Sequence, residues 1–301
     1  MDKVFQQSIF DGTEQSMFNR SIQLIKEFEE VALYRNPIGY AIGYSGGKDS
    51  DVLVDLFIKS GVKFMVFHNH TTLDAPETVY YIRKKFKQWE SMGIPCKIYY
   101  PEQSFWSLCL KKKMLPSRIV RFCCSELKEK EIPELKYATH SFGVRKAESA
   151  KRAVLRDSIE TRNKVDYSDK KNFHFDNTAE VKETGSCYTN KYFIVNPIAY
   201  WSDEYLWNYI ESEKIEINPL YSEGFCRIGC IGCPMAGKHR EEEFKRYPKY
   251  KERYIKLCNE IMAIRKQEGL TNKYNFRTGE DYFNFWLNNK LPEKEYDLFK
   301  I

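Results

Sequence analysis

The chain has 301 residues, of which 42% are hydrophobic and 30% charged, and its net charge is +6. This length suffices for one large α/β domain with an appendage, and the apolar content supplies a core without oligomerisation. No apolar run reaches the roughly 18 residues that a membrane-spanning helix needs, and the first residues lack the apolar core of a signal peptide. We therefore expect a cytoplasmic protein with no membrane partner. The mild positive charge suits an anionic ligand without requiring a nucleic acid.

The first third of the sequence alternates between helical and strand patterns. The expected elements are strands at 38–44, 63–68 and 96–100 and helices at 14–36, 50–60 and 77–92. Two parallel strands joined by a helix form a βαβ unit, and ligands of such sheets bind beyond the carboxyl ends of the strands. The sequence thus predicts a ligand site at this edge of the sheet.

The rest of the chain continues the alternation and then becomes helical. The expected elements are strands at 137–143 and 192–198, helices at 104–114, 126–131, 202–212 and 239–268, a polar excursion at 145–185 that begins with a helix, and an aromatic tail from 279. The pattern predicts an α/β fold with a doubly wound parallel sheet and a C-terminal helical appendage. We divide the chain into an N-terminal helical segment (1–37), an α/β domain (38–225) and a cysteine-containing loop with the appendage (226–301).

A glycine-containing loop follows the first expected strand. It reads Ser45-Gly46-Gly47-Lys48-Asp49-Ser50 and leads directly into a helix. Glycines let backbone N–H groups approach an anion, the helix N-terminus adds partial positive charge, and the serine hydroxyls and the lysine add donors. The spacing is not that of a Walker loop and resembles the PP-loop of ATP pyrophosphatases and phosphoadenylyl-sulfate (PAPS) reductases. The alternative is an ordinary Gly-Gly turn before a capped helix.

Nine cysteines without a secretion signal indicate a reducing compartment, with metal-binding or reactive thiols rather than disulfides. Five of them form a pattern, Cys123-Cys124 and then Cys226-x3-Cys230-x2-Cys233. Thiolates at such spacing ligate iron–sulfur clusters or zinc, although buried thiols without a metal are an alternative. We expect Cys124, Cys226, Cys230 and Cys233 as ligands, with Cys123 as the alternate. The isolated cysteines are expected to be core or surface thiols, namely Cys96, Cys109, Cys187 and Cys258.

Three further stretches extend the resemblance to the PAPS reductase family. They are Cys123–Lys128, Gly143–Arg152, and Asn196–Ser202 followed by Trp207. Found in this order, they make the chain similar to that family over roughly residues 38–235. The resemblance implies an adenine nucleotide alpha hydrolase-like fold. It also implies a 4Fe–4S cluster, because the iron–sulfur branch of adenylyl-sulfate reductases pairs cysteines in this way.

The same resemblance implies roles for individual residues. The Ser45–Ser50 loop would hold the pyrophosphate of an adenine nucleotide, with Lys48 and Asp49 in catalysis and Asp49 helping to hold Mg²⁺. Arg145 would be a catalytic cation, and Arg145 and Arg152 would bind a sulfate or phosphate through their planar donor forks. The other expected nucleotide-binding residues are Asn69, His70 and Gly143.

Three functions remain open from the sequence. The first is an ATP-dependent PP-loop enzyme that adenylates an acceptor or hydrolyses ATP in a sulfur-transfer system, with a nucleic acid or small molecule as acceptor and a cysteine desulfurase-type protein as sulfur donor. The second is a reductase of APS or PAPS, which would need a thiol nucleophile, yet the last cysteine is Cys258 in a helical stretch. The third is a non-catalytic subunit that binds a nucleotide or nucleic acid.

Overall fold

The computed structural model describes residues 14–163, 191–270 and 276–288. These residues form two compact units, and each unit combines segments that are distant in the sequence. The first unit falls within residues 1–69, 76–99 and 131–228, and the second within 70–75, 100–130 and 229–301. The second unit thus takes in two internal segments beside the C-terminal one. The polar stretch from 164 to 185, the N-terminal residues 1–13 and Cys187 lie outside the described residues.

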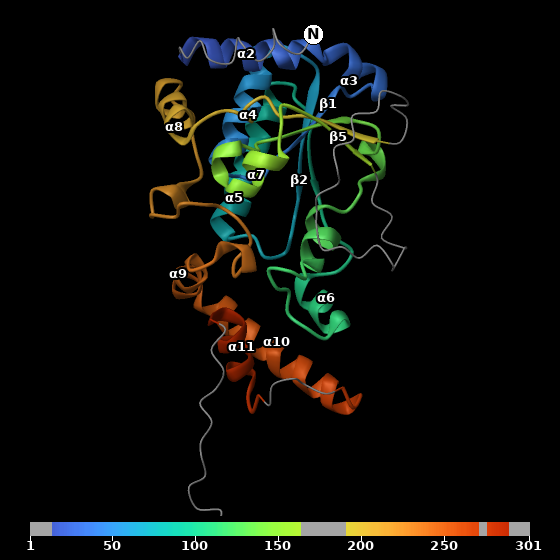
Figure 1. Cartoon of the computed structure of the whole chain (residues 1–301), viewed down its shortest axis with the longest axis vertical. Coiled ribbons are helices and arrows are strands. Elements are labelled where there is room, and N and C mark those ends of the chain that lie inside the picture. Colours follow the sequence, from blue (N-terminus) through green and yellow to red (C-terminus); the bar gives the residue numbers. More distant parts are fainter. Residues whose placement is uncertain (1–13, 164–190, 271–275, 289–301) are drawn as a thin grey trace, which may run out of the picture. The chain divides into compact units, whose positions relative to one another are not determined.

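The first unit is built on one six-stranded sheet in the order β3-β2-β1-β4-β6-β5 (Figure 1). The strands are β1 (Tyr40–Gly43), β2 (Phe64–Asn69), β3 (Cys96–Tyr99), β4 (Thr139–Phe142), β5 (Ile159–Asn163) and β6 (Lys191–Val195). All neighbouring strands pair in parallel except β5, which runs antiparallel to β6. This confirms the predicted α/β fold with a mainly parallel sheet. Strand β5 lies in the stretch predicted to be a polar excursion.

Helices cover one face of this sheet. They are α2 (Glu14–Glu27), α3 (Glu29–Arg35), α4 (Lys48–Ser60), α5 (Pro76–Ser91) and α8 (Asp203–Ser212). The short helix α7 (Ala150–Leu155) follows β4 in the sequence, and none of its described residues belongs to the core on this face. The single helix expected at 14–36 is two helices. Phe28 separates them with a ψ of 9°, and its ring lies 5.5 Å from that of Phe193. Packing of this aromatic ring therefore accompanies the break.

Alternation along the strands gives the sheet its two apolar faces. Ile42 and Val66 are fully buried in the larger core, together with side chains of α2, α4, α5 and α8. Ala41 and Phe67 point to the opposite face and pack with Leu135 and neighbouring residues. Because both faces are covered, the central strands read as continuous apolar runs in the sequence. This double burial fixes the carboxyl end of β1, where the glycine loop begins.

The second unit is helical. It contains α6 (Phe105–Lys112), a π-helical turn (Cys124–Lys128), α9 (His239–Arg246), α10 (Pro248–Gln267) and α11 (Gly279–Asn288). The single helix predicted at 239–268 is wrong, because Pro248 lacks the N–H that would continue α9 and instead starts α10. Aromatic rings from three of these helices pack together, with Tyr254 fully buried among them.

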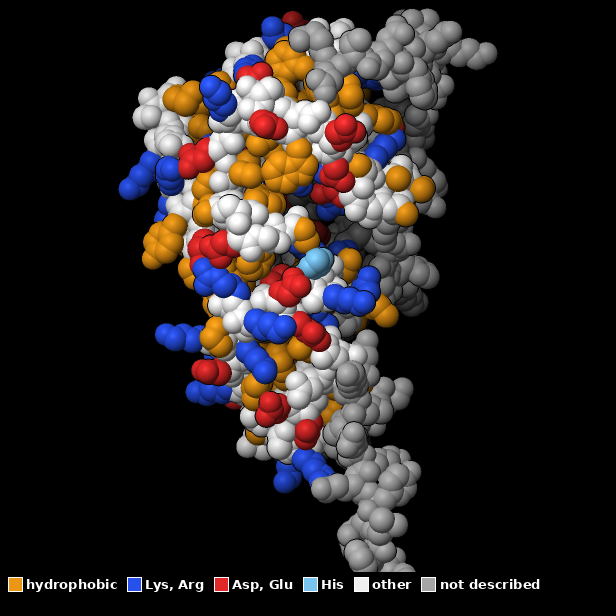
Figure 2. All heavy atoms as spheres, turned by 90° about the vertical axis from the view of Figure 1, so that its left-hand side faces the viewer, with side chains coloured by type: hydrophobic (Ala, Val, Ile, Leu, Met, Phe, Trp, Pro, Cys, Tyr) orange, Lys and Arg blue, Asp and Glu red, His pale blue; other side chains and the backbone are white. Residues whose placement is uncertain are grey.

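The surface has mixed charge. Figure 2 shows basic and acidic side chains interspersed over one face of the molecule, with apolar side chains between them. Among the described residues, no helix combines the length and the apolar character needed to cross a bilayer.

Candidate functional site

The Ser45–Ser50 loop connects β1 to α4 in the first unit. Gly46 has a φ of +73°, a conformation that residues with a Cβ rarely adopt, and an added Cβ would lie 3.0 Å from Cγ1 of Ile82. Gly47 follows in extended conformation and is the N-cap residue of α4. The two glycines therefore have separate tasks, since the first makes the turn and the second presents the start of the helix.

Two serine hydroxyls lie together in this loop. Ser50 Oγ donates to the carbonyl oxygen of Gly47 at 2.7 Å and lies 3.3 Å from Ser45 Oγ. Ser50 is buried, whereas Ser45 is exposed. Hydroxyl donors beside a helix N-terminus, where the first N–H groups of the helix lack partners within it, are a typical arrangement for binding an oxyanion.

Asp49 and Arg145 form an ion pair behind the loop. Arg145 Nε donates to Asp49 Oδ1 at 2.5 Å, and Nη2 donates to Asp203 Oδ1 at 2.6 Å. The remaining guanidinium nitrogen, Nη1, donates to the carbonyl oxygen of Trp201 at 3.2 Å, and Arg145 is 1% exposed. All three nitrogens of Arg145 are therefore engaged by the protein. The structure gives Arg145 a bracing position, in contrast to the open donor fork that an anion-binding arginine presents.

Gly143 lets the exit of β4 approach the loop closely. An added Cβ at Gly143 would lie 2.9 Å from the backbone carbon and oxygen of Asp49 and 3.0 Å from the nitrogen of Ser50. Such distances are too short for a Cβ, and neither backbone can yield without moving the start of α4. Gly143 thus sets the separation between β4 and the loop. In the loop itself, Asp49 Oδ2 also pairs with Lys48 Nζ at 2.9 Å.

Further arginines concentrate positive charge near Asp49. Burial and the charges of Arg156, Arg227 and Arg145 lower the pKa of Arg152, whereas Asp49 opposes this effect. Arg152 also pairs with Glu148 on the preceding turn, and Arg156 pairs with Glu160 at 2.9 Å. We call Arg145, Arg152, Arg156 and Arg227 the arginine group. Of the two arginines predicted from the sequence, Arg152 is the more exposed, with 41% of its side chain open to solvent.

Two residues that contact the loop were not predicted from the sequence. The N–H of Lys48 donates to the hydroxyl of Tyr221 at 3.1 Å, and Asn218 Nδ2 donates to the carbonyl oxygen of Gly46 at 3.1 Å. Both come from the segment after α8, more than 170 positions further along the chain. No spacing rule links positions so far apart, and the Asn-Pro turn at 218 was the only local signal.

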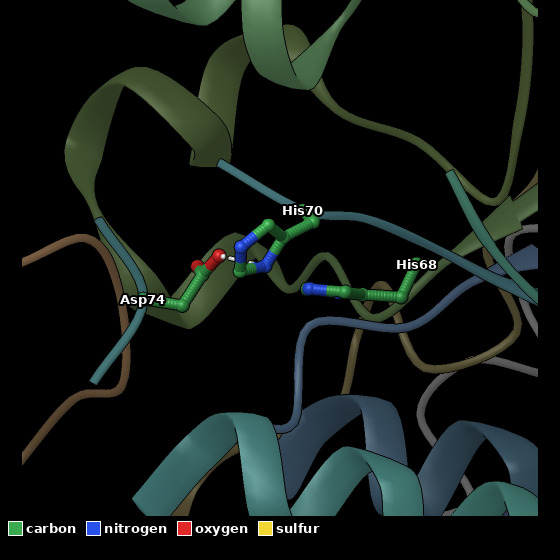
Figure 3. Close-up of side chains that lie close together, drawn as sticks. All are labelled: His68, His70 and Asp74. Carbon is green, nitrogen blue, oxygen red and sulfur yellow. Dashed lines mark ion pairs between the residues drawn. The ribbon is translucent and has the colours of Figure 1, made fainter. Parts of the chain in front are cut away.

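The two residues predicted at the end of β2 fall in different units. Asn69 ends strand β2 in the first unit. His70 belongs to the second unit, where Nδ1 of its ring faces Asp74 Oδ2 at 3.2 Å (Figure 3). His68, also drawn in Figure 3, lies within β2, and its Nδ1 is 2.8 Å from the carbonyl oxygen of Tyr44.

Four of the five expected cysteine ligands belong to the second unit. We call Cys123, Cys124, Cys230 and Cys233 the thiol cluster; Cys226 lies in the first unit and is exposed. Cys123 and Cys124 lie at the start of the π-helical turn. A hydrogen bond with Cys124, burial, and the charges of Cys124, Cys230 and Cys233 raise the pKa of Cys123, so the other three thiols lie within electrostatic range of Cys123.

The segment that carries Cys230 and Cys233 is held from several sides. Cys230 pairs with Asp74 in an isolated β-bridge, and its Sγ donates to Thr71 Oγ1 at 3.3 Å. Gly232 has a φ of +74°, and an added Cβ would lie 2.6 Å from the ring of Phe244. The N–H of Gly232 donates to Glu243 at 2.7 Å. The tight turn between the two thiols thus depends on a glycine and on contacts from outside the motif.

The thiols differ in acidity. A hydrogen bond from Cys123 lowers the pKa of Cys124 to about 7, against the opposing effect of burial. Burial, followed by the charge of Asp74, raises the pKa of Cys230 to about 12. The hydrogen bond from Cys123 thus favours the thiolate form of Cys124, whereas burial disfavours the thiolate form of Cys230.

Comparisons with known proteins agree with this description. Residues 39–236 match the model of the phosphoadenosine phosphosulfate reductase domain. The chain is 28% identical over 288 residues to Uncharacterized protein MJ0973 of Methanocaldococcus jannaschii, a match that covers 94% of this chain and 59% of that protein. The chain thus spans about three-fifths of this relative's length.

Two solved structures resemble the chain at low identity. One is the PAPS reductase from Candida auris in a phosphate complex, with 16% identity, a TM-score of 0.45, and coverage of 73% of this chain and 97% of that one. The other is the U34-tRNA thiolase NcsA from Methanococcus maripaludis with its 4Fe–4S cluster, with 14% identity, a TM-score of 0.43, and coverage of 87% and 84%. Because the family model covers most of the chain, including the glycine loop and all five patterned cysteines, this protein belongs to the phosphoadenosine phosphosulfate reductase domain family.

Proposed function

We propose that this protein is an ATP-dependent PP-loop enzyme that transfers an adenylyl group to an acceptor within a sulfur-transfer system. The observation that carries the proposal is the Ser45–Ser50 loop, in which the Gly47 N-cap, the two serine hydroxyls and Lys48 converge at the start of α4. The family supplies adenine nucleotide chemistry.

The loop residues would act on the leaving pyrophosphate. An acceptor oxygen would attack the α-phosphorus, the bond from that phosphorus to the bridging oxygen would break, and the acceptor proton would pass to solvent. Charge then builds on the pyrophosphate, where Lys48 and the hydroxyls of Ser45 and Ser50 would stabilise it. Catalysis of this kind depends mainly on positioning and charge neutralisation. Mg²⁺ bound with the nucleotide would share that charge, with Asp49 as its candidate protein ligand.

Arg145 would be a positioning residue in this scheme. Its ion pair orients Asp49, and its bonds to Asp203 and Trp201 anchor the start of α8 to the loop. Anion binding would fall instead to Arg152, which is the more exposed of the two. Asn69, Gly143 and His70 remain predicted nucleotide-binding residues.

The chemistry of the thiol cluster fits a 4Fe–4S cluster. Four free thiols of the second unit supply the number and the type of ligands that such a cluster requires. When bound, the cluster would offer an iron site for sulfur transfer or would brace the loop around Gly232. We therefore propose Cys123, Cys124, Cys230 and Cys233 as ligands, with Cys226 and zinc as the alternatives that metal analysis tests.

A reductase of adenylyl sulfate is the second candidate, because the family takes its name from that activity. Cys258, the last cysteine of this sequence, is a poor nucleophile for such a reaction. It is fully buried in α10, and burial raises its pKa to about 12. Both features oppose attack on an activated sulfate.

The test measures Mg²⁺-ATP binding and pyrophosphate release after anaerobic purification, with tRNA, DNA and small metabolites as acceptors. The double variant Ser45→Ala/Ser50→Ala should bind ATP at least tenfold more weakly, since hydrogen bonds to charged groups contribute about 1.5–3 kcal/mol each. The matched control is Ser60→Ala on the same helix, whose hydroxyl bonds only to the Phe57 carbonyl in the described structure. Sulfite release from APS or PAPS with a thiol donor and without ATP would instead establish the reductase.

A further inference from the structure

One large aromatic side chain of the first unit is exposed where the helix pattern predicts burial. Trp207 lies three positions before Ile210, a spacing that places two side chains on the same side of a helix. In the structure Tyr205, Leu206, Tyr209 and Ile210 of α8 are buried, whereas Trp207 is 40% exposed. Because 40% of Trp207 is exposed, part of the indole is open to a ligand.

Trp207 lies beside the Ser45–Ser50 loop. Its ring centroid is 5.9 Å from that of Tyr221, and the two rings are nearly perpendicular at 89°. Lys48 Nζ lies 5.8 Å from the Trp207 centroid and 5.9 Å from the Tyr221 centroid, within the range of cation–π attraction. The hydroxyl of Tyr221 also accepts the N–H of Lys48. One lysine therefore joins the aromatic pair to the proposed phosphate site.

The charge around this aromatic pair is suited to an anion. Lys48 is the cation beside both rings, and its Nζ also pairs with Asp49 Oδ2 at 2.9 Å. A partly exposed indole beside a lysine matches a nucleotide, whose base stacks on an aromatic ring while its phosphate binds a basic group. A purely apolar ligand would make no use of the lysine.

We propose that Trp207, held edge-on by Tyr221, forms a stacking surface for the nucleobase of a nucleotide whose phosphate lies at Lys48. This deepens the proposed function, on which it rests, by naming the chemistry of the ligand next to the loop. The base belongs either to ATP or to a single-stranded RNA acceptor. Tyr221, with its ring fixed by the hydrogen bond to the loop, holds Trp207 edge-on and leaves the exposed part of the indole for the base.

The experiment compares three probes on the full chain by isothermal titration and by anisotropy of labelled RNA. The probes are Mg²⁺-ATP, a short single-stranded RNA of mixed sequence, and inorganic pyrophosphate, which carries phosphate without a base. Trp207→Ala should weaken ATP or RNA binding about tenfold, because base stacking on an aromatic side chain contributes that much or more. Pyrophosphate affinity should stay unchanged, and Trp207→Phe should restore most of the lost affinity.

Two controls separate this proposal from the proposed function. Tyr34→Ala removes an aromatic side chain of the same unit that is 89% exposed on α3, and it should change no affinity. Ser45→Ala/Ser50→Ala should weaken pyrophosphate as well as ATP. If Trp207→Ala lowers the affinity for ATP, the stacked base belongs to ATP. If it lowers the affinity for RNA, the stacked base belongs to the acceptor. The proposal is overturned if Trp207→Ala leaves both unchanged, if it weakens pyrophosphate equally, or if the wild-type chain binds neither ATP nor RNA.

Discussion

The Ser45–Ser50 loop and the thiol cluster are organised in contrasting ways. The loop is a contiguous segment whose turn is made by its own residues, through the positive φ of Gly46 and the bond from Ser50 to Gly47. Tyr221 and Asn218 then form hydrogen bonds with its backbone. The thiol cluster joins two segments more than 100 positions apart and depends on outside contacts such as that of Thr71 with Cys230. A local site can form before its ligand arrives, whereas a dispersed set of thiols gains stability from the metal that it binds.

The largest effect should come from removing a thiol of the cluster. Cys123→Ala should abolish stoichiometric iron and sulfide, and it should destabilise the second unit by several kcal/mol, because metal-binding free energy adds to folding free energy. Iron and sulfide quantitation, visible absorption and thermal unfolding measure this. Cys226→Ala is the matched comparison and should retain iron. If Cys226→Ala lost the iron and Cys123→Ala retained it, the ligand set predicted from the sequence would be correct. Zinc in place of iron would refute the cofactor assignment.

The next largest effect should be a pH dependence of stability caused by Asp51, a buried carboxylate in the first turn of α4. Burial raises the pKa of Asp51 to about 7, although hydrogen bonds from Tyr44 and Tyr81 and the charge of Lys85 oppose the shift. The folded state thus holds the proton more tightly than the unfolded state, whose pKa is about 3.9. The stabilisation from this proton is complete below about pH 4 and is lost as pH rises to about 7.

The difference between wild type and Asp51→Asn isolates this contribution. Three pKa units correspond to at most about 4 kcal/mol, so the stability of Asp51→Asn relative to wild type should improve by up to that amount between pH 4 and pH 8. Chemical denaturation at the two pH values measures the change. A pH-independent difference in stability between the two proteins would show instead that Asp51 is ionised in the folded state.

Substitution of Arg145 tests whether the Ser45–Ser50 loop keeps its structure and its ATP affinity without a distant residue that contacts it. Arg145→Met should destabilise the first unit by about 3 kcal/mol, because it leaves Asp49 without its buried partner. ATP affinity should fall as well, through the reorientation of Asp49. Urea denaturation and ATP titration measure the two effects. Retained stability with lost ATP binding would instead favour direct contact between Arg145 and the nucleotide, as the sequence predicted.

Gly143 should give the smallest effect. Gly143→Ala places a Cβ against the backbone of Asp49, and overpacking of this kind costs about 1–3 kcal/mol. Because the clash falls on the loop, ATP affinity should fall too. Gly93→Ala is the control, since Gly93 has a φ of +82° and nothing lies within 4 Å of an added Cβ. It should cost about 1 kcal/mol without altering ATP binding. Equal ATP affinities of the two variants would contradict the proposed spacing.

Much of the fold followed from local patterns, and the exceptions have physical causes. Strand β5 was missed because its residues are polar. Glu160 is nevertheless 2% exposed there, since Arg156 and Asn196 donate hydrogen bonds to its carboxylate. The break before α10 was missed although Pro248 signals it, because the charged pattern continues through it. Local propensity identifies most elements, but it does not show which polar residues find buried partners.

Some features of the candidate site also followed from the local sequence, whereas others depended on distant residues. The Ser45–Ser50 loop was predictable because its glycines and hydroxyls act on neighbouring positions. Arg145 was recognised as a notable residue, yet its engagement by Asp49 and Asp203 was not, since those partners lie 96 and 58 positions away. Tyr221 offered no signal at all, because a tyrosine that accepts a loop N–H resembles any other tyrosine in the sequence.

The sequence by itself determined the family, the parallel α/β architecture, the glycine loop and the set of patterned cysteines, because each of these depends on residues close together or on a recurrent order of motifs. Only the tertiary structure decided that Arg145 is a buried brace, that Cys226 lies in a different unit from the thiol cluster, and that Trp207 faces solvent beside Lys48. These outcomes depend on which distant side chains share a space, and desolvation and charge pairing act on that arrangement rather than on chain order.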